Sequence, residues 1–258
     1  MRVIGMLLGI PEADQESVRA HANANIRTEP GKPQEYKGEF DPARAFKEFG
    51  DYLDFRMEHP ADDLMTELVH AEFEDEHGVT RKLTRQEALT YVSVVAGAGN
   101  ETTTRLIGWA GKVLWEHPDQ RRELAADLSL VPNAIEELLR FEPPPPHVGR
   151  YVTRDVEHYG QTVPEGSAIL MLVGAANRDD RRFPNGDSFD IHRANGQHLA
   201  FGYGIHFCLG AALARLEGRV ALEEILKRFP EWDVDMDRAH LAPTSTVRGW
   251  ETLPVVTP

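Results

Sequence analysis

The only cysteine of this 258-residue sequence, Cys208, lies in the segment FGYGIHFCLG, which runs from Phe201 to Gly210. An amphipathic stretch, AALARLEGRVALEEILKRF, follows directly, so we expect Cys208 in the first turn of a helix. The free N–H groups and the positive dipole end of a helix N-terminus stabilise a thiolate, which can be a metal ligand or a nucleophile. Glycines at 202 and 204 let the backbone turn tightly beside a large flat group. A lone cysteine is also often a small buried residue, so its type alone does not decide.

The spacing F-x-x-G-x-x-x-C-x-G, with His206 two residues before the cysteine, resembles the haem-binding signature of the cytochrome P450 family. The resemblance implies that Cys208 is the axial ligand of haem iron and that His206 contacts a haem propionate. A thiolate ligand donates electron density to iron and favours O–O cleavage. The other members of the implied cofactor-binding loop are Phe201, Gly202 and Gly210. A structural zinc site is disfavoured because the sequence has no second cysteine.

A second unusual segment, AGAGNETTT at 96–104, lies inside a long predicted helix. That helix starts at the capping box Thr84 to Glu87 and continues to about Glu116. Gly97 and Gly99 each cost about 1 kcal/mol relative to alanine in a helix interior. Two explanations stay open: close packing of another helix, or a local opening where backbone and hydroxyls face a ligand.

The same segment resembles the oxygen-binding groove of the cytochrome P450 family, in which an acid and an alcohol are adjacent. Carried over by position, Thr102 is the hydroxyl that holds dioxygen at the haem, and Glu101 is the acid that helps to deliver protons. Splitting an O–O bond requires such protons, supplied within hydrogen-bond reach. The resemblance also places Ala98 and Gly99 beside the cofactor.

Glu137 and Arg140 are three residues apart on a predicted helix, so they can form an ion pair. Such pairs usually lie on the surface and contribute less than about 1 kcal/mol. Followed by four prolines and by FDIHR at 189–193, this pair resembles the Glu-x-x-Arg motif of the cytochrome P450 family. The resemblance implies a structural interlock with Arg193, and it places Arg150 near the second haem propionate.

The elements that position these residues are mostly helical. Hydrophobic spacing and capping signals predict helices in the segments 1–10, 11–27, 42–57, 64–73, 84–116, 119–128, 131–141 and 208–229. Pro and Gly predict an exposed loop at 29–38, and Asp41 is the expected N-cap of the third helix. Predicted strands cover 151–156 and 168–173, followed by an irregular connection over 175–200 and short strands after Trp232. The last long helix is expected to bury Leu209, Leu213, Leu216, Val220 and Ile225.

We therefore expect a mainly α fold with a minor β region, forming one cytochrome P450-like domain over residues 1–258. The phrase LLGIPEAD at 7–14 resembles a junction well inside members of that family. The expected architecture is accordingly the C-terminal portion of the usual fold, N-terminally truncated by its first helices.

Composition narrows the function classes. A formal net charge of -14 argues against nucleic-acid binding, which requires a basic face. One cysteine allows no internal disulfide and suits the reducing cytoplasm, the expected location. The apolar run from Val3 to Ile10 is too short to span a membrane, and the acids Glu12 and Asp14 disfavour a signal peptide.

The resemblance implies an oxidoreductase that uses haem b (iron protoporphyrin IX) to insert one oxygen atom from O2 into a C–H bond of an apolar small molecule. No flavin or nicotinamide fingerprint is visible, so a ferredoxin-type electron donor with its reductase is the implied partner. Arg215 and Arg219 on the helix after Cys208 could attract such an acidic protein. Two alternatives stay open: a non-catalytic or weakly haem-binding remnant of such an enzyme, and a peroxide-driven haem-thiolate enzyme.

Overall fold

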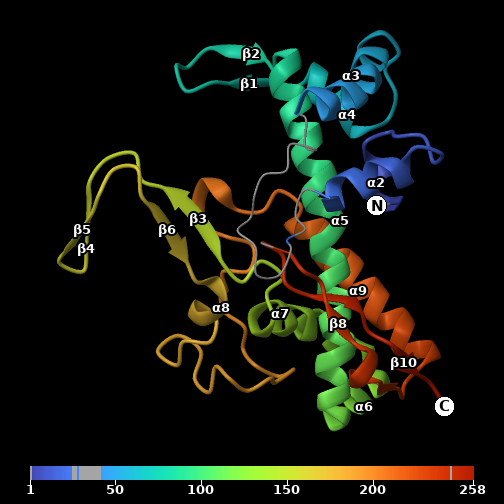
Figure 1. Ribbon diagram of the computed structural model, residues 1–258. Helices are drawn as coiled ribbons and strands as arrows, with labels where there is room; N and C mark the ends of the chain where they lie inside the picture. The colour runs from blue at the N-terminus through green and yellow to red at the C-terminus, as the bar shows by residue number, and fades with distance from the viewer. Residues whose placement is uncertain (1, 25–27, 29–41, 245) are drawn as a thin grey trace. The chain divides into compact units, whose positions relative to one another are not determined.

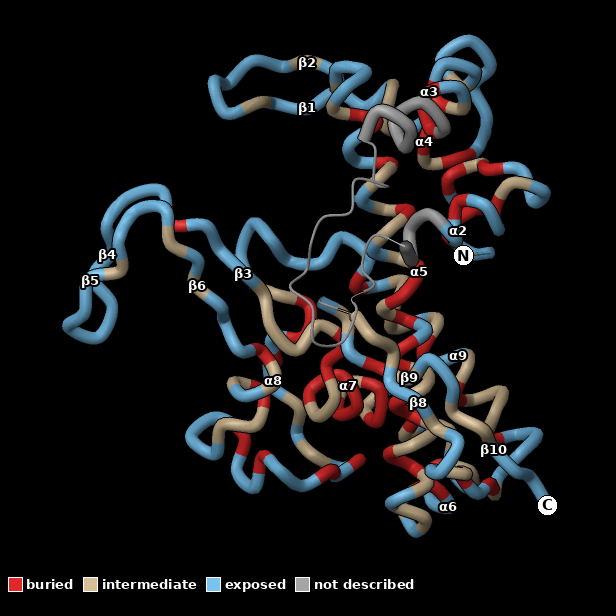
Figure 2. Tube along the Cα trace, viewed as in Figure 1, coloured by how far each residue is buried: buried red, intermediate tan, exposed pale blue. Residues whose placement is uncertain are grey.

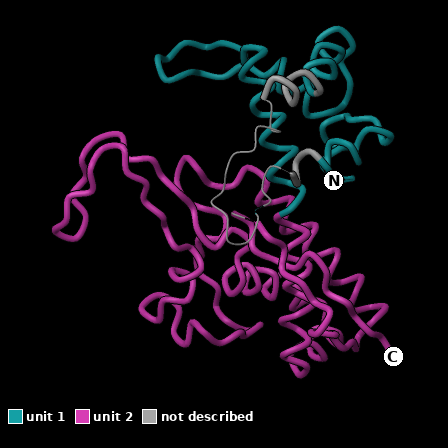
Figure 3. The backbone as a smooth tube through the Cα atoms, viewed as in Figure 1, with its two compact units in different colours: residues 1–101 teal, residues 102–258 magenta. Residues whose placement is uncertain are grey.

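The computed structural model describes residues 2–24, 28, 42–244 and 246–258. The chain divides into two compact units, residues 1–101 and 102–258, and the division falls inside the longest helix (Figure 3). Each unit is described by itself. The prediction of one domain over 1–258 therefore stays a prediction.

Unit 1 is built from short helices, one hairpin and the first half of the long helix α5 (Figure 1). Asp63 caps α4, because its carboxylate accepts a hydrogen bond from the backbone N–H of Thr66 at 2.9 Å. The buried centre of the unit includes Leu8, Leu53 and Met65, each fully buried. Its elements are α1 (Arg2–Leu7), α2 (Gln15–Ala24), α3 (Pro42–Glu58), α4 (Leu64–His70), the antiparallel strands β1 (Glu72–Glu74) and β2 (Thr80–Lys82), and α5 (Arg85–Glu116).

Several predicted boundaries in unit 1 shift. The helix expected from Pro11 begins at Gln15, because the backbone N–H groups of Asp14 and Gln15 bond back to Pro11 and Glu12 in tight turns. The predicted end at Arg27, the loop at 29–38 and the cap at Asp41 lie outside the described residues. The helix expected to reach Phe73 ends at His70, and Phe73 lies on strand β1.

Helix α5 begins at the predicted capping box and is helical without interruption to Glu116. Glu87 accepts from the Thr84 backbone N–H at 2.8 Å, and the Glu87 N–H donates to the Thr84 hydroxyl at 3.2 Å. At Gly99 the close-packing explanation holds, since an added Cβ would lie 2.5 Å from Cδ1 of Ile4. At Gly97 an added Cβ would meet no atom within 4 Å, so that position is open. The glycine segment causes no break in the helix.

Unit 2 carries the second half of α5, four further helices and four two-stranded antiparallel sheets among its described residues (Figure 1). The helices are α6 (Pro118–Ala126), α7 (Val131–Phe141), α8 (Val173–Ala176) and α9 (Ala211–Arg228), with short 3-10 turns at Leu128–Leu130, Gly204–His206 and Met236–Arg238. The strand pairs are β3 (Val148–Tyr151) with β6 (Ala168–Met171), β4 (Val156–His158) with β5 (Gln161–Val163), β7 (Asp233–Val234) with β10 (Val255–Val256), and β8 (His240–Leu241) with β9 (Trp250–Thr252). The mainly α fold with a minor β region is thus confirmed.

Helix α7 lies at the centre of the unit 2 core, where Figure 2 shows it almost entirely buried. Its Leu138 is fully inaccessible and belongs to one apolar cluster with Leu106 of α5 and Leu222 of α9. Burying one leucine contributes about 1.5–3 kcal/mol, so this cluster is a principal source of stability. Gly218 lets α9 approach closely, because an added Cβ there would lie 3.1 Å from Leu106.

The predicted buried face of α9 is wrong in part: Ile225 packs against the unit 2 core and Leu213 is partly buried, but the other three predicted residues are exposed. Leu209 precedes the helix and is 79% exposed, while Leu216 and Val220 are also exposed. The helix buries a different face, formed by Ala211, Gly218, Leu222 and Leu226. Small residues carry part of this contact, and a search for large apolar residues passes over them.

The Glu-x-x-Arg interlock is confirmed and is fully buried. The Glu137 carboxylate accepts two hydrogen bonds from Arg140 at 2.7 Å and one from Arg193 at 3.1 Å. Arg140 also donates to the backbone carbonyls of Asn177 and Gly186 in the irregular connection that leads toward Cys208. This is not the usual surface pair, because both Glu137 and Arg140 are 0% exposed.

The β region follows the prediction with a shift. The strand expected at 151–156 is divided into β3, which ends at Tyr151, and β4, which begins at Val156. The turn at Tyr159 and Gly160 separates β4 from β5, with positive φ at both residues. Within the described residues, no helix is both long and apolar enough to cross a membrane.

Candidate functional site

The loop from Phe201 to Gly210 is held by its own backbone. The Cys208 N–H donates to the Phe201 carbonyl at 2.8 Å, and a 3-10 turn at Gly204–His206 occupies the space between them. Gly202 and Gly204 have φ of 73° and 64°, a left-handed conformation that strongly favours glycine. The tight glycine turn expected from the sequence is therefore present.

Cys208 lies before α9, not in its first turn as the sequence predicted. The helix begins at Ala211 with Gly210 as its N-cap, and the Cys208 carbonyl accepts from the Ala211 N–H at 3.3 Å. The Cys208 carbonyl makes an i to i+3 turn bond with Ala211 instead of an α-helical one, and the Cys208 N–H bonds back to Phe201, so the cysteine belongs to the loop. The thiol is free and exposed.

Apolar side chains flank the sulfur and are left open. Ile205 is 98% exposed and Leu209 79%, while Phe207 is half exposed. An added Cβ at Gly204 or Gly210 would meet nothing within 4 Å, so the loop presents open space on these backbone positions. Such a concentration of exposed apolar groups is typical of a surface that another apolar body covers.

The donor set fits haem rather than a bare metal ion. Among the described residues there is no group of three or more His, Cys, Asp or Glu side chains that could hold a metal. A metal already held in a macrocycle needs one protein ligand, which the exposed thiol supplies. The flanking apolar side chains and the open glycines suit a flat, largely apolar ring.

The other predicted haem contacts in unit 2 are exposed cationic or cationisable groups. His206 lies in the 3-10 turn of the same loop, and its carbonyl would be 3.0 Å from a Cβ added at Gly202. Arg150 is on β3, opposite Ile169 of β6, and donates to the Gly149 carbonyl at 2.8 Å. No carboxylate of the described part of the chain forms an ion pair with Arg150, which leaves its charge for an external anion.

The predicted oxygen-side residues are consecutive on α5. Glu101 is 8% exposed and lies with Ala98 and Gly99 in unit 1, while the half-buried Thr102 begins unit 2. The structure therefore brings together Cys208, Phe201, Gly202, His206 and Gly210 in one loop. The roles of Glu101, Thr102, Ala98 and Gly99 stay predictions.

Behind the loop lies an ion-pair network that the sequence reasoning missed. Arg215 of α9 donates to both carboxylate oxygens of Glu136 on α7, at 2.6 and 3.0 Å. The ring of His198 contacts the same carboxylate through Nε2 at 3.1 Å. Burial pushes the pKa of Glu136 up, but the hydrogen bonds from His198 and Arg215 and the guanidinium charge outweigh it and lower that pKa to about 2.

This network also changes the expected role of the helix arginines. Arg215 is paired with Glu136, and Arg219 lies 3.6 Å from Glu223 on the same helix. Both cations are thus already balanced by carboxylates inside the chain, which weakens their predicted attraction for an acidic partner.

Comparison with known proteins decides the family. The family model described as Cytochrome P450 matches residues 34–249, which include Glu101, Thr102, the Glu137–Arg140 pair and Cys208. The chain belongs to the cytochrome P450 family. Membership implies a haem-thiolate cofactor, in agreement with the donor set of the Cys208 loop.

Relatives of this cytochrome P450 chain come from several bacteria. It is 38% identical to Putative cytochrome P450 123 of Mycobacterium bovis, covering 99% of this chain and 63% of the relative. It is 36% identical to Cytochrome P450 monooxygenase PikC of Streptomyces venezuelae, covering 98% and 60%. Among solved structures, P450BioI in complex with a hexadec-9Z-enoic acid ligated acyl carrier protein gives a TM-score of 0.88 at 34% identity, covering 99% and 65%. The chain thus spans about 63% of the length of these curated relatives.

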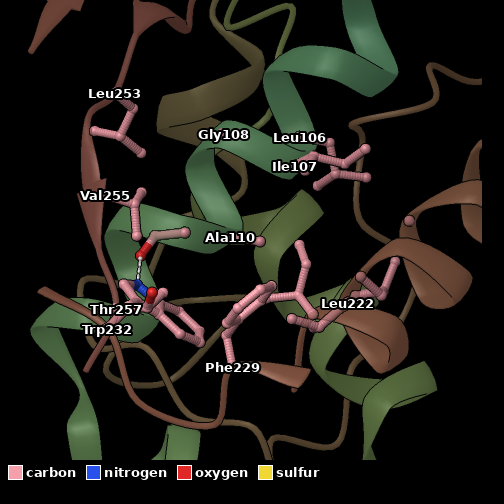
Figure 4. A pocket seen from close by; sticks show the side chains of 14 residues that line it. Leu106, Ile107, Gly108, Ala110, Leu222, Phe229, Trp232, Leu253, Val255 and Thr257 are labelled. Atoms are coloured by element: carbon pink, nitrogen blue, oxygen red, sulfur yellow. Dashed lines mark hydrogen bonds between the residues drawn. The ribbon is translucent and has the colours of Figure 1, made fainter. Parts of the chain in front are cut away.

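An apolar pocket of about 390 Å³ occupies another part of unit 2 of this cytochrome P450 chain (Figure 4). It lies among the second half of α5, the later turns of α9 and the C-terminal strand β10. Its lining includes Leu106, Gly108, Leu222, Phe229, Leu253 and Val255. None of its lining residues belongs to the predicted haem or oxygen site, so this pocket is not the candidate functional site.

Proposed function

We propose that this chain is the haem-thiolate part of a monooxygenase that inserts one oxygen atom from O2 into a C–H bond of an apolar small molecule. The observation that carries the proposal is the exposed Cys208 thiol on a left-handed glycine loop, in a chain of the cytochrome P450 family. Several relatives support this chemistry through their names, among them Cytochrome P450 monooxygenase PikC.

When bound, haem supplies the activation of O2 and the oxidation of the C–H bond. Cys208 would hold the haem iron through its sulfur. His206 and Arg150 are both exposed, and each would donate to a haem propionate. Phe201, Gly202 and Gly210 keep the loop compact and leave room for the ring.

Proton delivery is assigned to α5. Thr102 would hold a proton on Oγ1 for the reaction, and Glu101 would take up a proton on its carboxylate and pass it on to Thr102. The two residues are consecutive on α5, and their shared role is carried over from the resemblance to the acid–alcohol pair of the family. The resemblance also assigns Ala98 and Gly99 to the cofactor side of the helix. The position of an added Cβ at Gly99 is already filled by Ile4, so Ala98 is the small residue that would leave room for the cofactor.

Electrons come from a ferredoxin-type donor with its reductase, since the sequence has no flavin or nicotinamide motif. Substrate class follows from the relatives only in part. EryK was solved as a mutant in complex with erythromycin B, and P450BioI was solved in complex with an acyl carrier protein ligated to hexadec-9Z-enoic acid. An apolar small molecule is therefore the proposed substrate class here. The cytoplasm is the proposed location.

The alternative that the test below must exclude is a remnant that binds haem weakly and does not turn over. A stable thiolate-ligated haem would favour the enzyme, and loose or absent haem would favour the remnant.

The CO spectrum of the reduced protein tests the proposal. Wild-type chain reconstituted with haem should give a thiolate-type Soret band, and Cys208→Ser should abolish it because serine supplies no thiolate. Ala212→Ser, an exposed position in the first turn of α9, introduces the same hydroxyl nearby and should keep the band. A histidine-type band or no band in the wild type would reject the proposal in favour of the remnant.

A further inference from the structure

The apolar pocket of about 390 Å³ has the size of a small-molecule site, and it belongs entirely to unit 2. Pockets that hold small molecules in proteins measure about 300–1,000 Å³ and are lined mainly by apolar side chains. An engineered apolar cavity of about 150 Å³ already binds benzene. The pocket of this chain therefore has room for a molecule built from two aromatic rings.

Three segments from distant parts of the chain form the walls (Figure 4). Helix α5 contributes Ile107, helix α9 contributes Leu222, and strand β10 contributes Val255. The Trp232 Nε1–H donates to the Gly111 carbonyl at 2.9 Å, which attaches the segment after α9 to α5. Strand β10 is in turn paired with β7. These bonds lie within the protein, so the walls are in place before any ligand binds, as is usual for ligand pockets.

The charges in and around the pocket favour an uncharged ligand. Among the described residues that line it, none has a charged side chain. Lysines that neighbour the lining in sequence already have carboxylate partners, because Lys112 lies 2.6 Å from Glu116 and Lys227 lies 2.9 Å from Glu224. Burying an ionised group without a partner is strongly unfavourable. The pocket should therefore exclude fatty acids and other anions.

The lining residues extend from the surface of unit 2 to its buried core. Phe229 and Val255 are 47% and 48% exposed, whereas Leu222 and Ala110 are buried. The exposed side gives a ligand access without unfolding of the chain, and the buried side offers it apolar surface away from water. A second copy of the chain is a less suitable occupant, because a formal net charge of -14 on each copy opposes self-association.

We propose that this pocket is a second binding site of the chain, separate from the Cys208 loop, and that it takes an uncharged apolar small molecule of about the size of two aromatic rings. The occupant contacts α5, α9 and β10 together, so its binding stabilises unit 2. The inference does not depend on haem, because no lining residue belongs to the predicted haem site.

The test compares two probes with the same rings, the neutral N-phenyl-1-naphthylamine and its sulfonated counterpart 8-anilino-1-naphthalenesulfonate. Equilibrium dialysis against the full-length chain measures how much of each probe is bound. The wild type should bind a single equivalent of the neutral probe at this site. It should bind the sulfonate about tenfold more weakly or worse, because the lining has no cation to pair with it. Equal affinities for the two probes would contradict the selection for uncharged ligands.

Val255→Trp places a large ring in the open side of the pocket and should weaken binding of the neutral probe by about tenfold or more. Val256→Trp is the matched control, because this next residue of β10 is 62% exposed, points to the other face of the strand and does not line the pocket. It should leave the affinity unchanged. Val255→Lys supplies a cation and should raise the affinity for the sulfonate. Circular dichroism and thermal unfolding establish that the variants are folded, and Thr257→Trp, at an exposed lining position, replaces Val255→Trp if that variant is not.

Unchanged binding of the neutral probe in both blocking variants, or an equal loss in Val256→Trp, would overturn the inference. A wild-type dimer in light scattering that binds no probe and that Val255→Trp converts to monomers would also overturn it, because a second copy would then cover the pocket. The haem-loaded chain should lose the same single equivalent in Val255→Trp, which separates this site from any probe bound beside haem. If the chain fails to bind haem, the proposed function fails, and dialysis of the haem-free variants still decides whether the pocket is a binding site.

Discussion

Cys208 is held in place by its backbone, so that its side chain stays available as a ligand. Its N–H is held by Phe201, its carbonyl by Ala211, and its sulfur is left exposed. Because the cysteine lies ahead of α9, the N-terminal dipole of that helix is a weaker explanation for a thiolate than the sequence suggested.

The low pKa of Glu136 makes a prediction about stability and pH. A carboxyl whose pKa falls from its ordinary value of 4.5 to about 2 on folding stabilises the native state above pH 4.5, and the contribution is lost as the pH falls toward 2. Between pH 4.5 and 2 the free energy of unfolding should therefore fall less in Glu136→Gln than in the wild type. We expect the difference to be on the order of 1–2 kcal/mol, because solvent screens the partly exposed carboxylate. Urea titrations at a series of pH values measure it. Other carboxylates with lowered pKa, such as Glu87 and Asp179, should keep part of the slope in place. An identical slope in wild type and variant would contradict the assignment.

The network around Glu136 shows what the sequence could not predict. The cysteine, its glycines and His206 are close in sequence, so their spacing carried the information. Arg215 and His198 are 79 and 62 residues from Glu136 along the chain, and no local pattern marks the pairing. The one local signal was that Glu136 precedes Glu137 of the interlock, and this did not indicate which cation Glu136 would pair with.

At the scale of elements, α7 is the support of the site, since it carries Glu136 toward α9 and Glu137 toward the irregular connection. Glu137 is 0% exposed and accepts from two arginines and from the Asp190 backbone N–H at 3.0 Å. Its removal leaves the equally buried Arg140 charge without a carboxylate partner. The stability of the element therefore depends on this one anion.

Glu137→Gln should lower the free energy of unfolding by about 3–5 kcal/mol, the usual cost of an uncompensated buried charge. Asp119→Asn is the matched control, because its pair with Arg122 is exposed and should cost less than about 1 kcal/mol. Denaturant unfolding gives both values, and hydrogen exchange at the Asp190 amide should accelerate in Glu137→Gln alone. Equal small losses in the two variants would show that the buried pair is not the anchor of the connection.

The elements themselves were largely predictable. Capping residues and prolines gave the start of α5 and both ends of α7 correctly, because these signals act locally. The buried face of α9 was predicted only in part, because Gly218 contributes through close approach rather than through apolar size. The division between β3 and β4 was missed because a change of strand partner at Val152 to Asp155 leaves no mark in residue type.

At the scale of the whole molecule, the two compact units share one helix. The division between them falls between Glu101 and Thr102, and α5 is hydrogen-bonded as one helix through this point. Helices are cooperative, so melting one half of α5 destabilises the other. The single domain expected from the sequence stays a prediction, which the unfolding of this shared helix can test.

Calorimetry of the full chain tests this expectation together with haem binding. We expect one unfolding transition, and haem at about one hundred times its dissociation constant should add about 2.7 kcal/mol of stability. For a chain of this size the added stability raises the melting temperature by roughly 5–10 °C. Cys208→Ala should keep the single transition, because the apolar contacts of the loop remain. It should lose most of the haem-induced rise in melting temperature, because the iron–sulfur bond cannot form. Two separate transitions, of which haem raises only one, would instead mean that the units unfold independently and that the cofactor is held by one of them alone.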